Sequence, residues 1–142
     1  MRTYATLLAL CLSMGLSAVG CTKVSPPPPS PGELTTAALT AAKDATAVVV
    51  GTIVDAKIKE LQDTHPSTAV HEFTLEVARK LSGQDVSGKL TVVYSTRSER
   101  EQTAFATGQQ YVVVLRKEAT PAGWAATFVA PWSEALEQSL RK

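Results

Sequence analysis

The chain has few of the residues that carry chemistry, with two cysteines and two histidines among 142 residues. Cys11 lies in an N-terminal segment that we expect to be removed, so the mature protein would keep only Cys21 and form no internal disulfide. The glycines are dispersed and form no phosphate-binding loop, and no Gly-x-Ser-x-Gly motif supplies a nucleophile. The sequence therefore predicts no catalytic residue, no metal site and no cofactor.

An excess of charge of one sign is also missing. The sequence contains 14 Lys and Arg residues against 13 Asp and Glu residues. Arg2 is the one charged residue in 1–20, so its removal would leave 13 residues of each sign. The basic residues are scattered and form no stripe that could neutralise phosphates, which argues against nucleic acid as a partner.

What the sequence does have is a short apolar segment, 3–19, that leads to Cys21. The segment is shorter than the roughly 20 apolar residues that a spanning helix needs. With Arg2 before it and the small residues Ala18 and Gly20 after it, the order resembles a bacterial lipoprotein signal. In that family the peptidase cleaves before a cysteine whose thiol carries diacylglycerol. The family usually has Leu where this chain has Ala18.

The resemblance implies that Cys21 is the lipidated N-terminus of the mature protein, with membrane lipid as its first partner. It places the protein in a bacterial cell envelope, because two or more acyl chains hold durably in a bilayer. Thr22 stands where such lipoproteins carry Asp for inner-membrane retention, which favours the outer membrane facing the periplasm. An ordinary signal peptide is the alternative, since Ala18-x-Gly20 is also an acceptable cleavage site. That alternative would give a soluble exported protein with a free Cys21 thiol.

A proline-rich segment follows the cysteine, and five of the eight prolines lie in 26–31. Such a run favours extended polyproline II at about 3.1 Å per residue, so 22–32 could span roughly 30 Å. We therefore expect three parts. These are a lipoprotein signal peptide (1–20), a lipidated cysteine with a proline-rich tether (21–32) and a small β-barrel domain with a C-terminal helix (33–142).

Five later segments alternate between apolar and polar residues with the period of a strand. Gly51 interrupts the first of them and predicts a bulge or bend. A polar loop, 61–68, is expected between the first two. The predicted strands are 47–59, 72–78, 90–97, 110–117 and 124–130. Val49 and Ile53 make the first half of the first segment apolar on both faces. The residues expected to share one face within each segment are Val48, Val50, Val54, Ala56 and Ile58, then Phe73, Leu75 and Val77 (expected to point inward), then Leu90, Val92 and Tyr94, then Tyr111, Val113 and Leu115, then Trp124, Ala126 and Phe128.

Short helices are expected on either side of the strands. One covers 33–44, and a second follows Ser133 with Trp132, Leu136 and Leu140 on one stripe. A turn is expected at 121–123, and the charged connection from 97 could hold a helical turn. The fold class that follows is mainly β, a small five-stranded antiparallel OB-like barrel with short flanking helices.

Three of the predicted strands also carry a resemblance. The strings AVVVGTIV (47–54), FTLEV (73–77) and GQQYVVVL (108–115) are similar to a recurrent exported bacterial domain with an OB-like or netrin-module-like barrel. The similarity covers most of 45–130 and concerns packing, so it implies a fold and no chemistry. Metalloprotease inhibitors of the netrin class use a free N-terminal cysteine amine, which an acylated Cys21 would lack.

The histidines are the first candidates for chemistry. His65 and His71 could bind a metal with Asp63 or Glu72 as third ligand, but the spacing matches no known motif. We expect both rings to be exposed to solvent instead. Glu72 and Glu76 project from one strand face and could form an acid/base pair, although a solvated face is the simpler interpretation.

Two further groups of residues could bind a partner. The segment 97–101 balances its own charges and is interpreted as a solvated connection, with a partner-binding loop as the alternative. Four aromatic residues could line a ligand-binding face, although their positions among aliphatic residues favour a role in the core. They are Tyr94, Tyr111, Trp124 and Phe128.

The function predicted from these observations is that of a membrane-anchored envelope lipoprotein. Its domain would be a non-catalytic accessory module that binds an envelope protein or a cell-wall component. The alternatives are a protease-inhibitor-like OB module, the soluble exported protein described above, and an enzyme that works through His71, Glu72 or Glu76.

Overall fold

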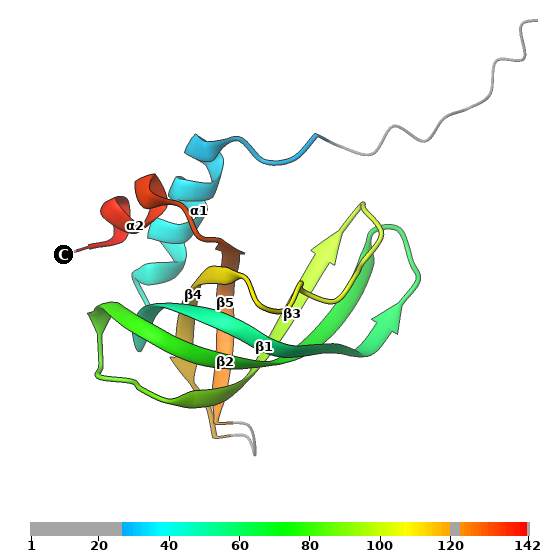
Figure 1. The fold of residues 1–142 in the computed structure, drawn as a ribbon. Helices are drawn as coiled ribbons and strands as arrows, with labels where there is room; N and C mark the ends of the chain where they lie inside the picture. The colour runs from blue at the N-terminus through cyan, green and yellow to red at the C-terminus, as the bar shows by residue number, and fades with distance from the viewer. Residues whose placement is uncertain (1–26, 120–122, 142) are drawn as a thin grey trace, which may run out of the picture.

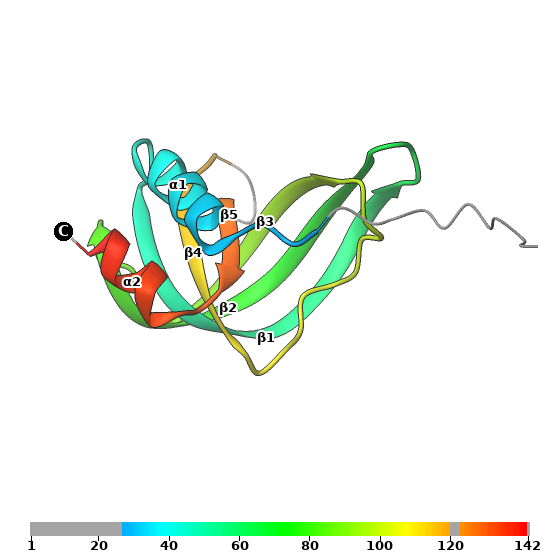
Figure 2. The same ribbon diagram turned by 90° about the horizontal axis from the view of Figure 1, so that it is seen from above.

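The structure is a computed structural model that describes residues 27–119 and 123–141. The signal segment, Cys21 and most of the turn predicted at 121–123 lie outside the described residues. Five strands close into a barrel in the order β1-β2-β3-β5-β4, and two helices cover one outer face (Figures 1 and 2). The predicted fold class is confirmed. The elements are α1 (Pro31–Ala42), β1 (Ala47–Gln62), β2 (Ser67–Gly83), β3 (Lys89–Ser98), β4 (Gln110–Lys117), β5 (Trp124–Pro131) and α2 (Glu134–Leu140).

The barrel is antiparallel except where β3 meets β5. These two strands pair in parallel, Val92 opposite Trp124 and Val93 opposite Ala125. The wholly antiparallel barrel expected from the sequence is corrected here, and the reason is geometric. Strand direction alternates at every antiparallel pair, so a closed ring with an odd number of strands must contain a parallel pair.

Both faces of the sheet are buried near the helices. All of β4 from Tyr111 to Leu115 is buried. Tyr111, Val113 and Leu115 share one face as expected and point into the barrel, whereas Val112 and Val114 pack under the helices. The unbroken apolar run of β4 follows from this, because a strand that is covered on both faces has no position for a polar residue.

Irregular pairing changes the faces along β1. Its register with β2 shifts between Val50 and Gly51, where an added Cβ would lie 2.7 Å from the carbonyl oxygen of Glu76. The predicted irregularity at Gly51 is therefore confirmed. The even-numbered residues of β1 do not share one face: Val48 and Val50 pack in the outer cluster under the helices, Val54 is 40% exposed, and Ala56 packs against the barrel interior with Val49 and Ile53. The expectation of one shared face was wrong, because Val54 has no β2 partner between the Ile53–Leu75 and Asp55–Thr74 pairs, and this bulge moves the residues after it to the other face.

The same effect corrects the prediction for β5. Trp124 and Ala126 belong to the barrel interior, but Phe128 packs in the outer cluster beneath the helices. The register between β4 and β5 shifts at this point, so that Thr127 has no partner between the Leu115–Ala126 and Val114–Phe128 pairs. The three residues therefore do not share one face.

The first two strands are longer than predicted. The polar loop expected at 61–68 is half strand and shrinks to residues 63–66, since β1 ends at Gln62 and β2 begins at Ser67. The resulting β1–β2 hairpin extends away from the two helices (Figure 2). The tip of this hairpin and the end of β3 meet at the far end of the barrel, which we call the mouth.

Helix α1 begins two residues before the predicted start. Ser30 is its N-cap and Pro31 its first residue, and the Ser30 and Glu33 side chains each accept a hydrogen bond from the other's backbone N–H. This capping box stabilises the first turn. Only Ala38 of α1 is fully buried. No helix within 27–119 or 123–141 has the length and apolar character needed to span a bilayer.

Helix α2 is held in place by a buried carboxylate. Ser133 caps the helix, and Leu136 and Leu140 are buried as predicted, although Trp132 is 39% exposed. Glu137 is 5% exposed and accepts hydrogen bonds from Arg79 of β2, from the Trp132 indole and from Arg141. These donors hold the pKa of the Glu137 carboxyl well below its usual range, with Arg79 the largest cause.

Candidate functional site

The connection from β3 to β4 closes the mouth of the barrel. Residues 99–109 contain no helix, so the helical turn considered for this connection is absent. Hydrogen bonds fix its end, where the Gly108 N–H donates to the Ile53 carbonyl oxygen at 2.8 Å. Between its ends the loop places the ring of Phe105 against the barrel interior.

Phe105 is the centre of an aromatic cluster formed with His71, Phe73, Tyr94 and Tyr111. Its ring centroid lies 4.9 Å from that of His71, 5.4 Å from Phe73, 5.7 Å from Tyr111 and 6.0 Å from Tyr94. The contacts with Phe73 and Tyr111 are edge-to-face, at 76° and 74°. Edge-to-face contact is a favourable arrangement for aromatic rings. The aromatic cluster therefore fills the barrel interior at this end.

His71 is the polar member of this cluster. It is 3% exposed, so the expectation of a solvent-exposed ring was wrong. His71 lies on the inward face of β2, in alternation with Phe73 and Leu75. Neither ring nitrogen has a hydrogen-bond partner among the described residues. Burial lowers the pKa of His71, and the nearby Gln102 side chain opposes that shift in part. His71 is therefore a neutral ring with two unused hydrogen-bonding atoms near neutral pH.

Gln102 connects the aromatic cluster to the surface. Its Nε2 donates to the Ser67 carbonyl oxygen at 3.2 Å. Its side chain also lies close enough to raise the pKa of His71 in part, but no Gln102 atom meets hydrogen-bond geometry with either ring nitrogen. Burial also raises the pKa of Tyr94, which is opposite His71 in the β2–β3 ladder. The polar groups around His71 thus leave its nitrogens unpaired.

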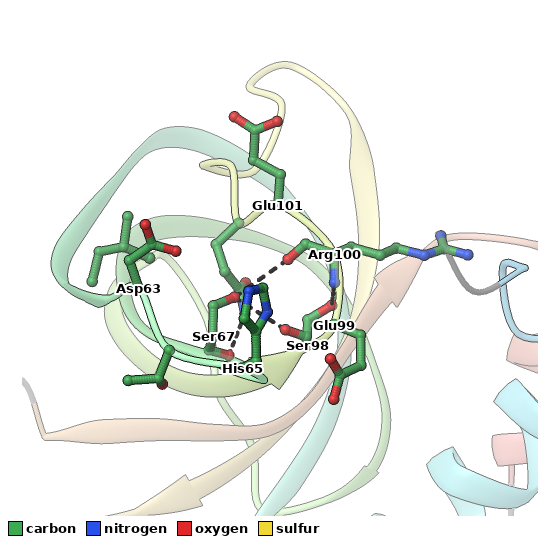
Figure 3. Close-up of a pocket in the computed structure, with 10 residues that line it drawn as sticks. Asp63, His65, Ser67, Ser98, Glu99, Arg100 and Glu101 are labelled. Carbon is green, nitrogen blue, oxygen red and sulfur yellow. Dashed lines mark hydrogen bonds between the residues drawn. The ribbon is translucent and has the colours of Figure 1, made fainter. Parts of the chain in front are cut away.

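An open hollow of about 330 Å³ adjoins this cluster at the mouth (Figure 3). It lies between the tip of the β1–β2 hairpin and the start of the β3–β4 loop, and Gln102 belongs to its wall. The Ser67 hydroxyl donates to the carbonyl oxygens of Ser98 at 3.0 Å and Arg100 at 3.3 Å, and the Arg100 N–H donates to Ser98 Oγ at 3.0 Å. These bonds join the hairpin to the loop and fix the shape of the hollow.

The charged residues around the hollow do not converge. Figure 3 shows the side chains of Asp63, Glu101 and Arg100 directed away from its centre, where the His65 ring lies beside Ser67. Among the described residues no group of three or more His, Cys, Asp or Glu side chains could hold a metal ion. A ligand in the hollow could therefore form hydrogen bonds and apolar contacts, but the charged side chains around it are not directed toward its centre.

The residues predicted for chemistry are distributed over separate places. His65 is exposed at the hairpin tip, whereas His71 is inside the barrel. Glu72 projects from the opposite face of β2 and binds the amines of Lys57 and Lys59, each at 3.0 Å, which lower its pKa. The structure therefore does not bring His71 and Glu72 together, because adjacent residues of a strand face opposite ways.

Sequence reasoning missed Phe105, Gln102 and Ser67. The one available signal was Phe105 itself, a single large apolar residue within an otherwise polar connection. Comparison with known proteins finds no matching family model, no significantly similar curated protein and no significantly similar solved structure. Function is therefore inferred from the residues themselves.

Proposed function

We propose that this protein is a lipid-anchored binding module of a bacterial cell envelope, and that it binds its partner through the mouth of the barrel. It has no catalytic role in this proposal. Acylated Cys21 holds it in a membrane, with the outer membrane facing the periplasm as the expected place. Its partner is an envelope protein or a cell-wall component.

The observation that carries the proposal is the order of residues before the domain. An apolar segment, small residues, Cys21 and a proline-rich segment follow one another, and helix α1 begins at Pro31, directly after the prolines. Only nine residues separate Cys21 from this helix. At about 3.1 Å per residue, an extended chain of that length would hold the domain roughly 30 Å from the headgroups.

The shape of the mouth supports a binding role. It presents a hollow with hydrogen-bonding groups at the end of the barrel that is farthest from the helices (Figures 2 and 3). A concave surface of this kind, with a few polar groups among apolar ones, is typical of ligand sites.

Intact-mass measurement of the protein purified from bacterial membranes tests the anchor. We expect a chain that begins at Cys21 and carries the added mass of acyl chains. Cys21→Ser is expected to lose that mass and to move from the detergent phase to the aqueous phase on partitioning.

Cys11→Ser is the matched control, because Cys11 would be discarded with the signal segment. Its mature mass and partitioning should equal those of the native protein. A native protein that retains residues 1–20, or that has an unmodified Cys21 and stays in the aqueous phase, would overturn the proposal.

A further inference from the structure

We propose that the aromatic cluster is a binding site for an aromatic ring that carries a hydrogen-bonding group, and that Phe105 occupies this site when no ligand is bound. The inference rests on the proposed function, since it names the chemistry that the binding module takes. The ring could belong to a free small molecule or to a side chain of a partner, and the chemistry is the same for both.

The hydrogen-bonding requirement comes from His71. A neutral imidazole offers one donor and one acceptor, and both atoms are buried without a partner among residues 27–119 and 123–141. Nearly all buried polar side-chain atoms in folded proteins have a hydrogen-bond partner, so two ring nitrogens without one need an explanation. A ligand hydroxyl, which both donates and accepts, would supply the missing bond.

The requirement for a ring comes from the walls around Phe105. Its neighbours His71, Phe73 and Tyr111 lie at centroid distances of 4.9, 5.4 and 5.7 Å, so the space that Phe105 fills has the shape of a six-membered ring. A ligand ring in this place would keep the edge-to-face contacts. It would also bring its hydroxyl to His71, which the hydrocarbon ring of Phe105 cannot do.

The loop around Phe105 allows the exchange. Phe105 is only half-buried, its neighbours Ala104 and Ala106 are exposed, and within the described chain residues 103–105 make no hydrogen bond. The bonds from Gln102 to Ser67 and from Gly108 to Ile53 hold the loop on either side. Phe105 can therefore leave while the rest of the mouth stays in place, and because Phe105 is itself partly exposed, its departure opens the cluster to solvent.

The binding test compares p-cresol with p-xylene, which has a methyl group in place of the hydroxyl. The protein is the mature chain with Cys21→Ser, which keeps every described residue and lacks acyl chains that would absorb the probes. An apolar cavity alone would favour p-xylene, the more hydrophobic ring. We expect p-cresol to bind at least fivefold more tightly and to shift the NMR signals of the His71 ring nitrogens and of residues 103–106.

Two variants separate the roles of Phe105 and His71. Phe105→Ala removes the competing ring and is expected to tighten p-cresol binding at least tenfold, because the open state no longer has to be selected. His71→Leu is expected to reverse the preference in favour of p-xylene. Phe128→Ala is the matched control, since it opens a cavity under the helices and should leave the His71 signals unmoved by p-cresol.

Tighter binding of p-xylene than of p-cresol to the unsubstituted mouth would overturn the inference, as would His71 signals that stay unchanged at saturation. If Phe105→Ala does not fold, the shifts of 103–106 in the protein with Phe105 intact decide the same question. A blocked Ala-Ala-Tyr-Ala-Ala peptide distinguishes the source. Tighter binding of the peptide than of p-cresol supports a partner side chain, and weaker binding supports a small molecule. Because none of these readouts depends on acylation, their failure would leave the lipid anchor standing.

Discussion

The two ends of this barrel each bury one polar side chain, and the two side chains differ in whether they have hydrogen-bond partners. At the helical end, Glu137 of α2 is 5% exposed and is bound by Arg79, Trp132 and Arg141. At the mouth, His71 is 3% exposed and neither of its nitrogens has a partner among the described residues. These are the two buried polar or charged residues in the described part of the chain.

The two residues differ in how the free energy lost on burying a polar group is recovered. A buried carboxylate with several donors links α2 to β2, so the free energy lost on desolvation is recovered by hydrogen bonds and ion pairs. A buried imidazole without partners recovers nothing within the folded protein. The helical end is therefore the part that secures the fold, and the mouth is the part that has free energy left to gain from a ligand.

Removing the Glu137 charge should have the largest effect of the substitutions that test this comparison. Glu137→Gln leaves Arg79 and Arg141 without their carboxylate, and losing one partner of a fully buried pair costs about 3–5 kcal/mol. Since Arg79 is 37% exposed and Arg141 is 62% exposed, water replaces part of the interaction. We expect the free energy of unfolding in urea to fall by about 2 kcal/mol.

The pH dependence of Glu137 gives an independent check. Its pKa is lowered by folding, so its contribution is present above the ordinary value of 4.5 and is lost as the pH falls below it. The native protein should lose more stability than Glu137→Gln between pH 5 and roughly pH 2. Glu134→Gln, on the exposed side of α2, is the control. Equal acid profiles for the native protein and Glu137→Gln would contradict the role given to this carboxylate.

Phe105→Ala should have a moderate effect that is confined to the mouth. Truncating a fully buried Phe costs about 3–5 kcal/mol, and Phe105 is half-buried, so we expect about 1–2 kcal/mol. Hydrogen exchange should speed up for the amides of 103–109 and stay unchanged in α2. Thr103→Ala, in the same loop, should change neither quantity. A loss of stability spread over the helices would remove the distinction between the two ends.

His71→Leu should raise stability, by about 1 kcal/mol near pH 7, because an apolar residue replaces an unpaired polar one. Burial lowers the pKa of His71 from 6.5, so the unfolded chain takes up a proton first as the pH falls. The native protein should therefore lose stability below about pH 6.5, and His71→Leu should lose less. Urea unfolding at pH 7.5 and pH 5 measures both. Lower stability of His71→Leu at neutral pH would show that the imidazole is paired after all.

Glu72→Gln should have the smallest effect. Its partners Lys57 and Lys59 are 63% and 50% exposed, and exposed ion pairs contribute little. We expect a change in the free energy of unfolding in urea that is within measurement error and is reduced further by salt. A larger loss of stability, or a loss of p-cresol binding, would show that this outer face of β2 contributes to ligand binding at the mouth.

Alternation of apolar and polar residues predicted where the strands are but not every face. Leu90, Val92 and Tyr94 of β3 share one face as expected, inside the barrel, because β3 pairs with β2 without a shift. In β1 the bulged residue Val54 separates Val48 and Val50, which lie under the helices, from Ala56 in the interior, and in β5 Thr127 separates Ala126 from Phe128 in the same way. A bulge depends on the contacts between two strands, so the period of one strand alone does not reveal it.

The site was less predictable than the fold. His71 alternates with Phe73 and Leu75 on β2, which placed it on the inward face, yet its polar character suggested exposure. What buries it is Phe105, 34 residues away in the sequence, in a loop with no periodic pattern. The contact between them arises only when the β3–β4 loop folds back over the end of the barrel, and local propensity carries no information about such a contact.

The brief parallel contact of β3 has a consequence for the behaviour of the protein at high concentration. Only Val92 and Val93 pair with β5, so beyond Val93 one side of β3 is an unpaired edge strand among the described residues. Edge strands can recruit another chain by β-pairing, and polar or charged side chains are a common protection. Ser95 and Arg97 are exposed along this edge, which disfavours edge-to-edge aggregation between neighbouring copies at high concentration.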